Sequence, residues 1–419
     1  MDAIRKQLIL LLCSTALLLA SPFIDSRLLA LFGVVFAAVM YFVGKIRYFA
    51  IGTAVLALLY GFSIIPVSAF AGPLVMVLFG EVMRMLSVRT GHSLAVFGLA
   101  SAAALIFAMF YTQEFEPLVG SLAILVLLML RSILGEREDG SMLSLVGVSM
   151  TIVLFEDLEF FVDLRTLAFA ILLCAAFGYF AYRAKTIDMT GVFSAVLFGV
   201  LLISFTDTVS WFVILLVFFI LGSAFTKFKY SEKEFLGVAQ DKHGKRGYKN
   251  AFANAGVGVA AAILYGITGD MLYTAVFLGS VATATADTMA SEIGVTGGTP
   301  RMITTLKRCP PGTNGGVTLA GEIACVVGAL IIGGLGFLFG IAPWYVCLLA
   351  ALAGVIGTNL DSLYGALLEN RGVFGNSGTN LLATLSGGLA AAGLAIQPSS
   401  SVALFSSCLQ SFQASRYFQ

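Results

Sequence analysis

The residues best able to do chemistry gather in one stretch of the chain, from Ala284 to Val317. The stretch begins at the end of an apolar segment that carries Asp287 and Glu292. It continues into a loop with three cations, Arg301, Lys307 and Arg308. Magnesium takes one or two carboxylates together with waters and phosphate oxygens, and arginine and lysine side chains bind phosphate. The stretch therefore predicts a site for a phosphate group and its metal ion.

Carboxylates at the ends of apolar segments are the predicted metal ligands. They are Asp287, Glu292 and Asp361. A charge at the bilayer centre costs about 2.5–3.5 kcal/mol on insertion scales, so such a residue is a functional candidate by default. Asp287 lies nearer the interface, and its alternative role is to anchor the loop by pairing with Lys307 or Arg308. We predict Asp287, Glu292 and Lys307 as the catalytic residues.

A glycine-rich turn follows the cations and precedes the next apolar segment. Its residues are Gly312, Thr313, Asn314, Gly315 and Gly316. No GK[ST] follows, so the turn is not a Walker loop, but successive backbone N–H groups at a helix start form an anion cradle. We predict that these five residues bind phosphate together with Arg246, Asn250, Asn254, Arg301, Arg308 and Asn380. The alternatives are a tight turn, amides that bond a neighbouring helix, and cations that contact lipid headgroups.

The elements that position these residues are membrane helices. The chain has 419 residues, of which 59% are hydrophobic and only 11% are charged. Soluble domains carry about 25% charged residues, so the composition excludes an ordinary soluble protein. We predict an all-α polytopic membrane protein with about 15 transmembrane helices, at 7–23, 28–43, 46–65, 67–86, 92–112, 117–134, 141–155, 164–182, 189–205, 208–226, 251–268, 271–292, 318–341, 343–360 and 379–396.

The basic residues predict the orientation of these helices. With a cytoplasmic N-terminus, 21 of the 24 lysines and arginines fall on the cytoplasmic side. That bias follows the positive-inside rule and predicts a multi-pass protein of the cell membrane. The same orientation puts Asp287, Asp361 and the glycine-rich turn at the cytoplasmic face, where we expect the active site.

The polar residues also divide the chain. Residues 1–182 form ordinary hydrophobic spans, in which Glu81 and Arg84 are spaced as an intrahelical pair. Residues 183–397 carry polar groups at the cytoplasmic helix ends, and residues 398–419 form a C-terminal tail too broken to span a membrane. We predict a catalytic domain in the second segment and assign no role to the first.

Four ordered motifs resemble a known family. They are RGYKNAFAN at 246–254, ADTMASEIG at 286–294, PRMITT at 300–305 followed by PGTNGGV at 311–317, and DSLYGA at 361–366. Together they resemble the integral-membrane family that includes plant phytyl-phosphate kinase and transmembrane protein 19, over about residues 183–396. The family is distantly similar to dolichol kinase and CDP-diacylglycerol synthase. Members often have tryptophan after the Asp-Thr pair, where this chain has Met289.

The resemblance implies a phosphotransferase. Its members transfer a phosphoryl group from a nucleotide, typically CTP, to a polyprenyl monophosphate and give the diphosphate. Carried onto this sequence, Asp287, Glu292 and Asp361 hold magnesium. The implied partners are membrane lipid, nucleotide and isoprenoid phosphate, with no nucleic acid. A lipid or small-molecule transporter is the alternative, although transporters place polar residues near the midplane and not at one face.

Overall fold

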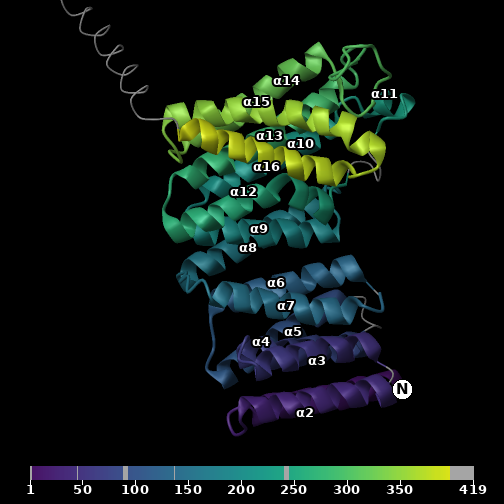
Figure 1. Ribbon diagram of the computed structural model, residues 1–419, viewed down its shortest axis with the longest axis vertical. Coiled ribbons are helices and arrows are strands. Elements are labelled where there is room, and N and C mark those ends of the chain that lie inside the picture. Colours follow the sequence, from purple (N-terminus) through teal and green to yellow (C-terminus); the bar gives the residue numbers. More distant parts are fainter. Residues whose placement is uncertain (1, 45, 88–92, 136, 240–244, 397–419) are drawn as a thin grey trace, which may run out of the picture. The chain divides into compact units, whose positions relative to one another are not determined.

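The computed structural model describes residues 2–44, 46–87, 93–135, 137–239 and 245–396 (Figure 1). The predicted C-terminal tail, 398–419, lies outside the described residues. The chain divides into two compact units, residues 1–200 and 201–419. The functional candidates of the sequence all belong to the second unit.

Unit 1 is a bundle of antiparallel and crossing helices. Its elements are α1 (Asp2–Ala20), α2 (Ser26–Val39), the π-helix η1 (Met40–Gly44), α3 (Arg47–Gly61), α4 (Val67–Leu86), α5 (Ser93–Thr112), α6 (Pro117–Leu134), α7 (Gly140–Glu156), α8 (Leu164–Arg183) and α9 (Met189–Thr206), which runs across the boundary. Large apolar side chains of α4, among them Phe70, Leu74 and Met76, are fully buried in its core. The predicted pair is present, because Arg84 Nε lies 2.8 Å from Glu81 Oε2.

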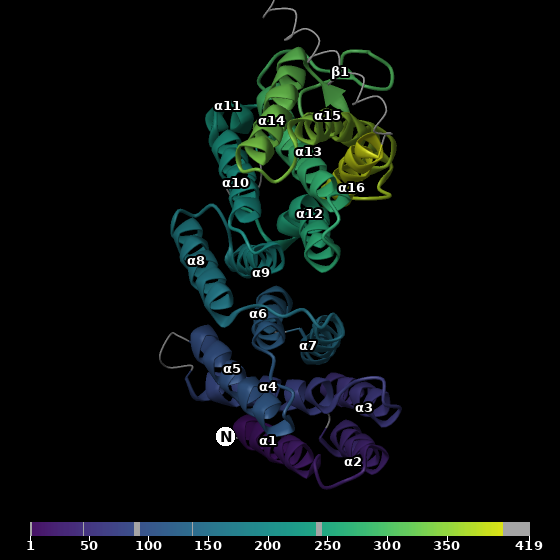
Figure 2. The same cartoon turned by 90° about the vertical axis from the view of Figure 1, so that its left-hand side faces the viewer.

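Unit 2 places one helix inside a ring of others. Its elements are α10 (Ser210–Lys227), α11 (Tyr230–Phe235), α12 (Tyr248–Thr268), α13 (Leu272–Gly294), β1 (Arg301–Met302), β2 (Gly316–Val317), α14 (Leu319–Leu338), α15 (Trp344–Leu367), the 3₁₀ helix η4 (Glu369–Arg371) and α16 (Asn376–Ala395). Helix α13 packs against α10, α12, α14, α15 and α16 (Figure 2).

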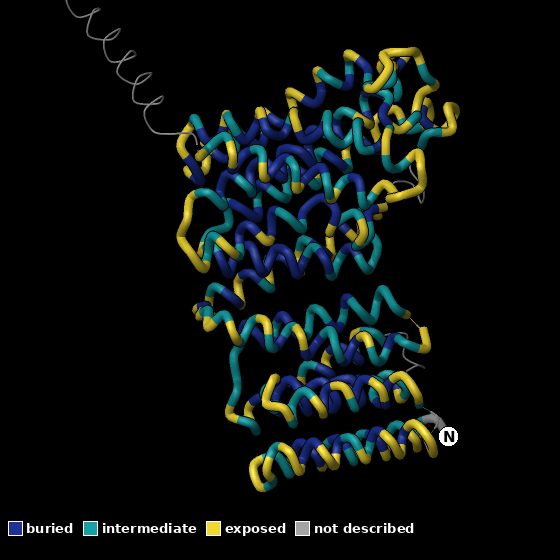
Figure 3. The backbone as a smooth tube through the Cα atoms, in the orientation of Figure 1, coloured by how far each residue is buried: buried dark blue, intermediate teal, exposed yellow. Residues whose placement is uncertain are grey.

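Helix α13 is built from small residues, and this lets its neighbours come close. A Cβ placed on Gly354 of α15 would lie 2.7 Å from Ala282, and one on Gly279 would lie 2.5 Å from Ala391 of α16. The small residues at 279–286 therefore allow the neighbouring helices to approach closely. Most of α13 is buried (Figure 3), so it has no need of large lipid-facing side chains.

The predicted spans agree with the helices. Each predicted span overlaps one helix of the described chain, from α1 to α10 and from α12 to α16. Ten helical segments of the described chain are long and apolar enough to cross a membrane, and two more apolar helices are shorter. The protein is therefore a helical, multi-pass integral membrane protein, while the number of crossings stays a prediction. The loop at 227–249 contains the unpredicted short helix α11.

Helix ends follow from local chemistry. Asp163 caps α8 by accepting hydrogen bonds from the backbone of Arg165 and Thr166, and Thr318 caps α14 through the N–H of Gly321. Gly269 ends α12 with φ of +68°, a conformation that favours glycine. Helix α15 continues seven residues beyond the predicted end at 360, so Asp361 lies within a helix and not at its end.

Candidate functional site

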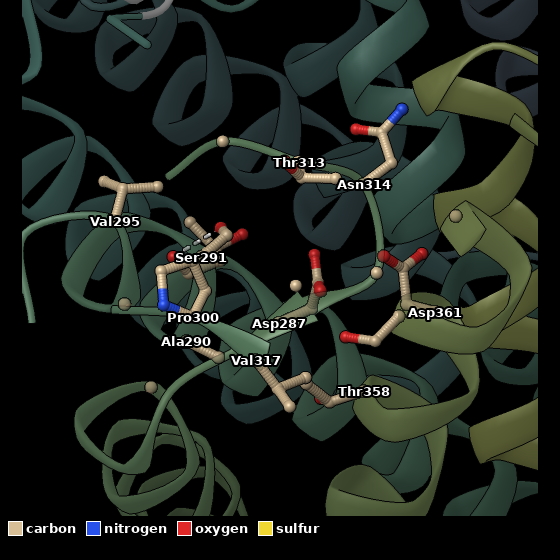
Figure 4. A pocket seen from close by; sticks show the side chains of 18 of the residues that line it. Asp287, Ala290, Ser291, Val295, Pro300, Thr313, Asn314, Val317, Thr358 and Asp361 are labelled. Atoms are coloured by element: carbon tan, nitrogen blue, oxygen red, sulfur yellow. Dashed lines mark hydrogen bonds between the residues drawn. The ribbon is translucent and has the colours of Figure 1, made fainter. Parts of the chain in front are cut away.

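A cavity of about 320 Å³ opens where the ends of five helices of unit 2 meet the β1–β2 connection (Figure 4). Its lining comes from the start of α12, the end of α13, the β1–β2 connection, the start of α14, the end of α15 and the start of α16. Of the predicted residues, the cavity is lined by Arg246, Asn250, Asp287, Gly312, Thr313, Asn314, Gly315, Gly316, Asp361 and Asn380. Residues far apart in the sequence thus share one site.

Two of the predicted carboxylates face each other in this cavity. The carboxyl groups of Asp287 on α13 and Asp361 on α15 lie close to each other in the cavity (Figure 4). The Oδ1 atom of Asp361 is buried and has no hydrogen-bond partner among the described residues. Two adjacent carboxylates repel each other unless a proton or a cation lies between them. The pair therefore suits a divalent cation, which takes one or two carboxylates.

Arg246 supplies positive charge to the same cavity. Its side chain is only 6% exposed, and its Nε and Nη1 atoms have no hydrogen-bond partner in the described part of the chain. The guanidinium carbon lies 5.6 Å from the ring centroid of Phe218, and Gly222 leaves it room, since a Cβ there would lie 2.5 Å from Nη2. Burial lowers the pKa of Arg246 to about 10, against the attraction of Glu292, so the group is charged at neutral pH.

The glycine-rich turn forms another wall. Gly312 and Gly315 have φ of +79° and +84°, and a Cβ on Gly315 would lie 2.6 Å from Ala366 of α15. Glycine is therefore required at 315 both by conformation and by space. The turn is held by the N–H of Ile303, which donates to Gly315 O, and by Asn370, whose Nδ2 donates to Asn314 O. The N–H of Thr313 donates to Pro310 O and the N–H of Gly316 donates to Thr313 O, so fewer than five N–H groups of the turn are left for the predicted phosphate cradle.

The predicted asparagines divide between two roles. Asn250 and Asn380 line the cavity. Asn254 is buried, donates to Asn250 O at 2.9 Å, and lies with its Oδ1 3.5 Å from Asn380 Nδ2. It does not line the cavity, and the prediction that it contacts phosphate is replaced by the alternative of a bond between helices α12 and α16.

Glu292 does not join the other two carboxylates as predicted. Its Oε2 accepts a hydrogen bond from Lys233 Nζ at 2.5 Å, and its Oε1 accepts one from the Thr226 hydroxyl at 2.9 Å. It does not line the cavity, and the described residues contain no group of three or more His, Cys, Asp or Glu side chains placed to hold a metal ion. A buried carboxylate is most stable beside a buried cation, and Lys233 on α11 provides it.

The three predicted cations of the loop also lie elsewhere. Arg301, Lys307 and Arg308 are exposed and do not line the cavity. They lie on the hairpin formed by β1 and β2, where Arg301 pairs with Val317 and also bridges Arg308. The Nη1 atom of Arg301 donates to the carbonyl of Leu306. The pairing fixes a hairpin whose cations are exposed outside the cavity lining, so the predicted binding of phosphate by Arg301 and Arg308 and the catalytic role of Lys307 stay predictions.

Two further carboxylates line the cavity and were missed. Glu322 of α14 accepts from Asn359 Nδ2 at 3.3 Å, and Glu369 of η4 accepts from the Thr379 hydroxyl at 3.3 Å. Glu322 had a signal in the sequence, as an acid in the first turn of an apolar helix at the same face. Lys233 had none, because it is one of seven basic residues in a loop whose charges read as solvated.

Comparisons with known proteins identify relatives of most of unit 2. A family model described as integral membrane protein DUF92 matches residues 172–410. An uncharacterized membrane protein of Methanocaldococcus jannaschii is 33% identical over 222 residues, which is 52% of this chain and 90% of the relative. Protein PGR of Arabidopsis thaliana is 31% identical over 232 residues, 49% of this chain and 80% of the relative.

A second plant relative is shorter in its match. Protein VTE6, chloroplastic, of Arabidopsis thaliana is 32% identical over 169 residues, which is 38% of this chain and 50% of the relative. No solved structure matches the chain. Because the family match begins at residue 172, most of unit 1 lies outside it.

Proposed function

The chain belongs to the integral membrane protein family DUF92, as its four motifs indicated, and we propose that its second unit is a membrane-embedded isoprenoid-phosphate kinase. It would transfer a phosphoryl group from a nucleoside triphosphate, CTP by the family resemblance, to a polyprenyl monophosphate. The proposal rests on the resemblance to phytyl-phosphate kinase together with the chemistry of one cavity.

One observation carries the proposal. A single cavity holds a buried arginine, two of whose nitrogens have no hydrogen-bond partner among the described residues, and two neighbouring carboxylates on helices α13 and α15. Arg246 calls for an anion, because an unpartnered buried charge is costly. Asp287 and Asp361 call for a cation for the same reason. A phosphate ester bound with a divalent metal ion satisfies both ends, and phosphoryl transfer depends mainly on such positioning and charge neutralisation.

Magnesium fits the residues present. Asp287 and Asp361 would hold it, and Asp361 Oδ1 is a buried oxygen that has no hydrogen-bond partner in the described part of the chain. The remaining positions of the ion would be filled by water and phosphate oxygens. When bound, the ion would neutralise charge on the phosphate oxygens. Glu322 and Glu369 also line the cavity, so its described lining residues carry four acids and one cation. That excess of negative charge favours a ligand that arrives with its metal.

The protein's own groups then have definite tasks. Arg246 would bind a phosphate oxygen and neutralise its negative charge inside the buried cavity. The N–H groups of the glycine-rich turn would orient a second phosphate. An oxygen of the lipid monophosphate forms a new bond to the terminal phosphorus of the nucleotide while the bond to the nucleotide's bridging oxygen breaks. The products are a lipid diphosphate and a nucleoside diphosphate.

The membrane placement is part of the proposal. Fifteen crossings with a cytoplasmic N-terminus put the cavity at the cytoplasmic face of the cell membrane, where nucleotides are present. Single cysteines at the exposed hairpin residue Thr304 and at Asp207 test this with an impermeant thiol reagent in intact cells. Thr304→Cys should be protected and Asp207→Cys labelled, and the reverse pattern would invert the orientation.

The activity itself is tested with the full chain in lipid nanodiscs. CTP, ATP and UTP are each supplied with magnesium, with and without a prenyl monophosphate, and the nucleoside diphosphate and lipid diphosphate are measured. We expect nucleotide consumption only when the lipid monophosphate is present. If no nucleotide is consumed, while labelled lipid crosses proteoliposomes that contain the protein, the kinase proposal is wrong and the transporter alternative replaces it.

A further inference from the structure

Helix α11 buries a charged side chain and exposes an aromatic one. Lys233 is 1% exposed, whereas Phe235, two residues further on, is 91% exposed and Leu236 is 44% exposed. In a soluble protein the aromatic residue would be buried and the lysine hydrated. The inverted arrangement indicates that the outer side of α11 meets apolar matter.

The buried lysine explains why so short a helix keeps its place. A six-residue helix is not stable by itself. Lys233 Nζ donates to the carbonyl of Phe225 at 2.8 Å and to Glu292 at 2.5 Å, which fastens α11 to α10 and α13. The chain then turns back, with the N–H of Val238 donating to Lys233 O, and Val238 packs against Gly312, where a Cβ would lie 2.4 Å from it. The anchored helix is thereby joined to the glycine-rich turn.

An open groove runs between α11 and the segment that follows α13. Most of its wall comes from six residues, Phe235, Leu236, Val295, Thr296, Gly298 and Pro311. Ser231 and Glu232 complete the wall. The groove has a volume of about 510 Å³ and is open to the surroundings of the protein.

This groove adjoins the polar cavity. Val295 lines both of them. Pro311 lines the groove, and the next residue, Gly312, lines the cavity. Leu236 lines the groove, and Val238 lines the cavity. A largely apolar groove therefore lies beside the cavity where Arg246 and the aspartates converge.

We propose that this groove binds the hydrocarbon tail of the same lipid phosphate whose headgroup enters the cavity. The inference rests on the proposed function, because it requires an acceptor with an anionic head and an apolar tail. A lipid of this kind needs a charged site and an apolar surface next to it, and the adjoining cavity and groove supply both. The exposed ring of Phe235 gives the tail an apolar wall, and Lys233 holds that wall in place.

The test compares acceptors of different length on Phe235→Ser in the full chain in nanodiscs. A twenty-carbon prenyl monophosphate should show a KM raised about tenfold, which is the discrimination that an apolar pocket provides. A five-carbon prenyl monophosphate is too short to reach far along the groove, and its KM should not change. The kcat should be unchanged for both acceptors, because Phe235 does not line the cavity.

Glu234→Ser is the matched control. Glu234 is exposed on the same helix and does not line the groove, so both KM values should stay at their original levels. Equal KM values for the two acceptors in Phe235→Ser and the unaltered protein, or an equal rise for both acceptors, would overturn the proposal.

A second measurement needs no turnover. A twenty-carbon monophosphate with a photoreactive group near the tail end is crosslinked to the unaltered protein, and the labelled peptide is identified. Labelling of the segment 231–236 that an excess of unlabelled monophosphate suppresses supports the groove. Labelling confined to other helices contradicts it. If both acceptors are inert but this segment is labelled, the kinase reaction fails while the lipid site remains.

Discussion

The two units differ in whether a buried arginine is paired with a carboxylate. In unit 1, Glu81 lies between two arginines, 2.8 Å from Arg84 Nε and 3.2 Å from Arg131 Nε, and all three side chains are about four-fifths buried. In unit 2, Arg246 is more deeply buried, and no carboxylate of the described residues forms an ion pair with it. A satisfied cluster holds helices together, whereas an unsatisfied one is poised for a ligand. The comparison separates structural charge from functional charge.

The cores of the two units differ in the size of their buried side chains. Unit 1 fills its centre with large apolar side chains such as Phe70 and Met76, while the centre of unit 2 is α13, with Gly279, Ala282 and Thr283 at its crossings. Large side chains keep helices apart and fill the space with apolar contacts. Small ones bring helix axes close, so that polar residues at several helix ends converge on one cavity.

The largest expected effect is on turnover. Asp287→Asn removes a carboxylate from the proposed metal pair, and we expect a loss of activity of about a thousand-fold, because several kcal/mol of charge stabilisation would be lost. Its counterpart is Glu81→Gln in unit 1, which should lower stability but leave turnover per folded molecule within about threefold. Steady-state kinetics on folded protein in nanodiscs measures both. Equal losses of turnover in Asp287→Asn and Glu81→Gln would contradict a catalytic role for the first carboxylate and a structural role for the second.

The next effect is on local stability. Lys233→Met leaves Glu292 buried without its cation, and breaking a buried pair costs about 3 kcal/mol or more. Hydrogen exchange of the α11 amides should therefore become about a hundred times faster. Arg137→Met breaks an exposed pair of unit 1, whose arginine side chain is 62% exposed, and should change the local exchange rate only slightly, because exposed ion pairs contribute little to stability.

The double variant Lys233→Met/Glu292→Leu sharpens this result. Replacing both charges by apolar groups should recover much of the lost protection, since no uncompensated charge remains. Protection in Lys233→Met equal to that of the unaltered protein would show that the pair does not anchor α11.

The smallest effect concerns anion binding by Arg246. Arg246→Met should weaken the binding of magnesium pyrophosphate about tenfold, because a charged hydrogen bond contributes about 1.5–3 kcal/mol. Calorimetry on the full chain measures it, with Arg84→Met of unit 1 as the control that keeps its affinity. An unchanged affinity of Arg246→Met for magnesium pyrophosphate would show that this arginine does not bind the anion.

The pH dependence of that binding has a definite sign. The pKa of Arg246 is lowered by burial to about 10, so the guanidinium stays protonated up to about pH 9 and its contribution is constant there. The contribution should fall as pH rises through 10. Over the same range the unliganded folded state gains stability, because the folded form releases its proton before the unfolded form does. Arg246→Met should show neither change.

The positions of the helices could be predicted because the hydrocarbon layer constrains each segment separately. A span needs about 20 apolar residues, and each predicted span overlaps a helix of the described chain. The grouping of Asp287, Asp361 and the glycine-rich turn was also predictable, because the number of predicted spans before each residue gives the side of the membrane on which we expect it. Which residues are expected on the same membrane face therefore depends only on the order of spans and loops along the chain.

Which of those residues meet was decided by packing. Glu292 lies five residues from Asp287, yet a lysine from α11 takes it out of the predicted metal set. Arg301, Lys307 and Arg308 lie beside the glycine-rich turn in sequence, and the hairpin leaves all three exposed.

The sequence by itself determined a helical membrane protein and its family, because hydrophobicity and motifs are local properties of the chain. Only the tertiary structure decided that Arg246 is the buried cation of the cavity and that Lys233 pairs with Glu292. Pairing of buried charges depends on distances between helices that are remote in sequence, and those distances are set by how closely small residues allow the helices to pack.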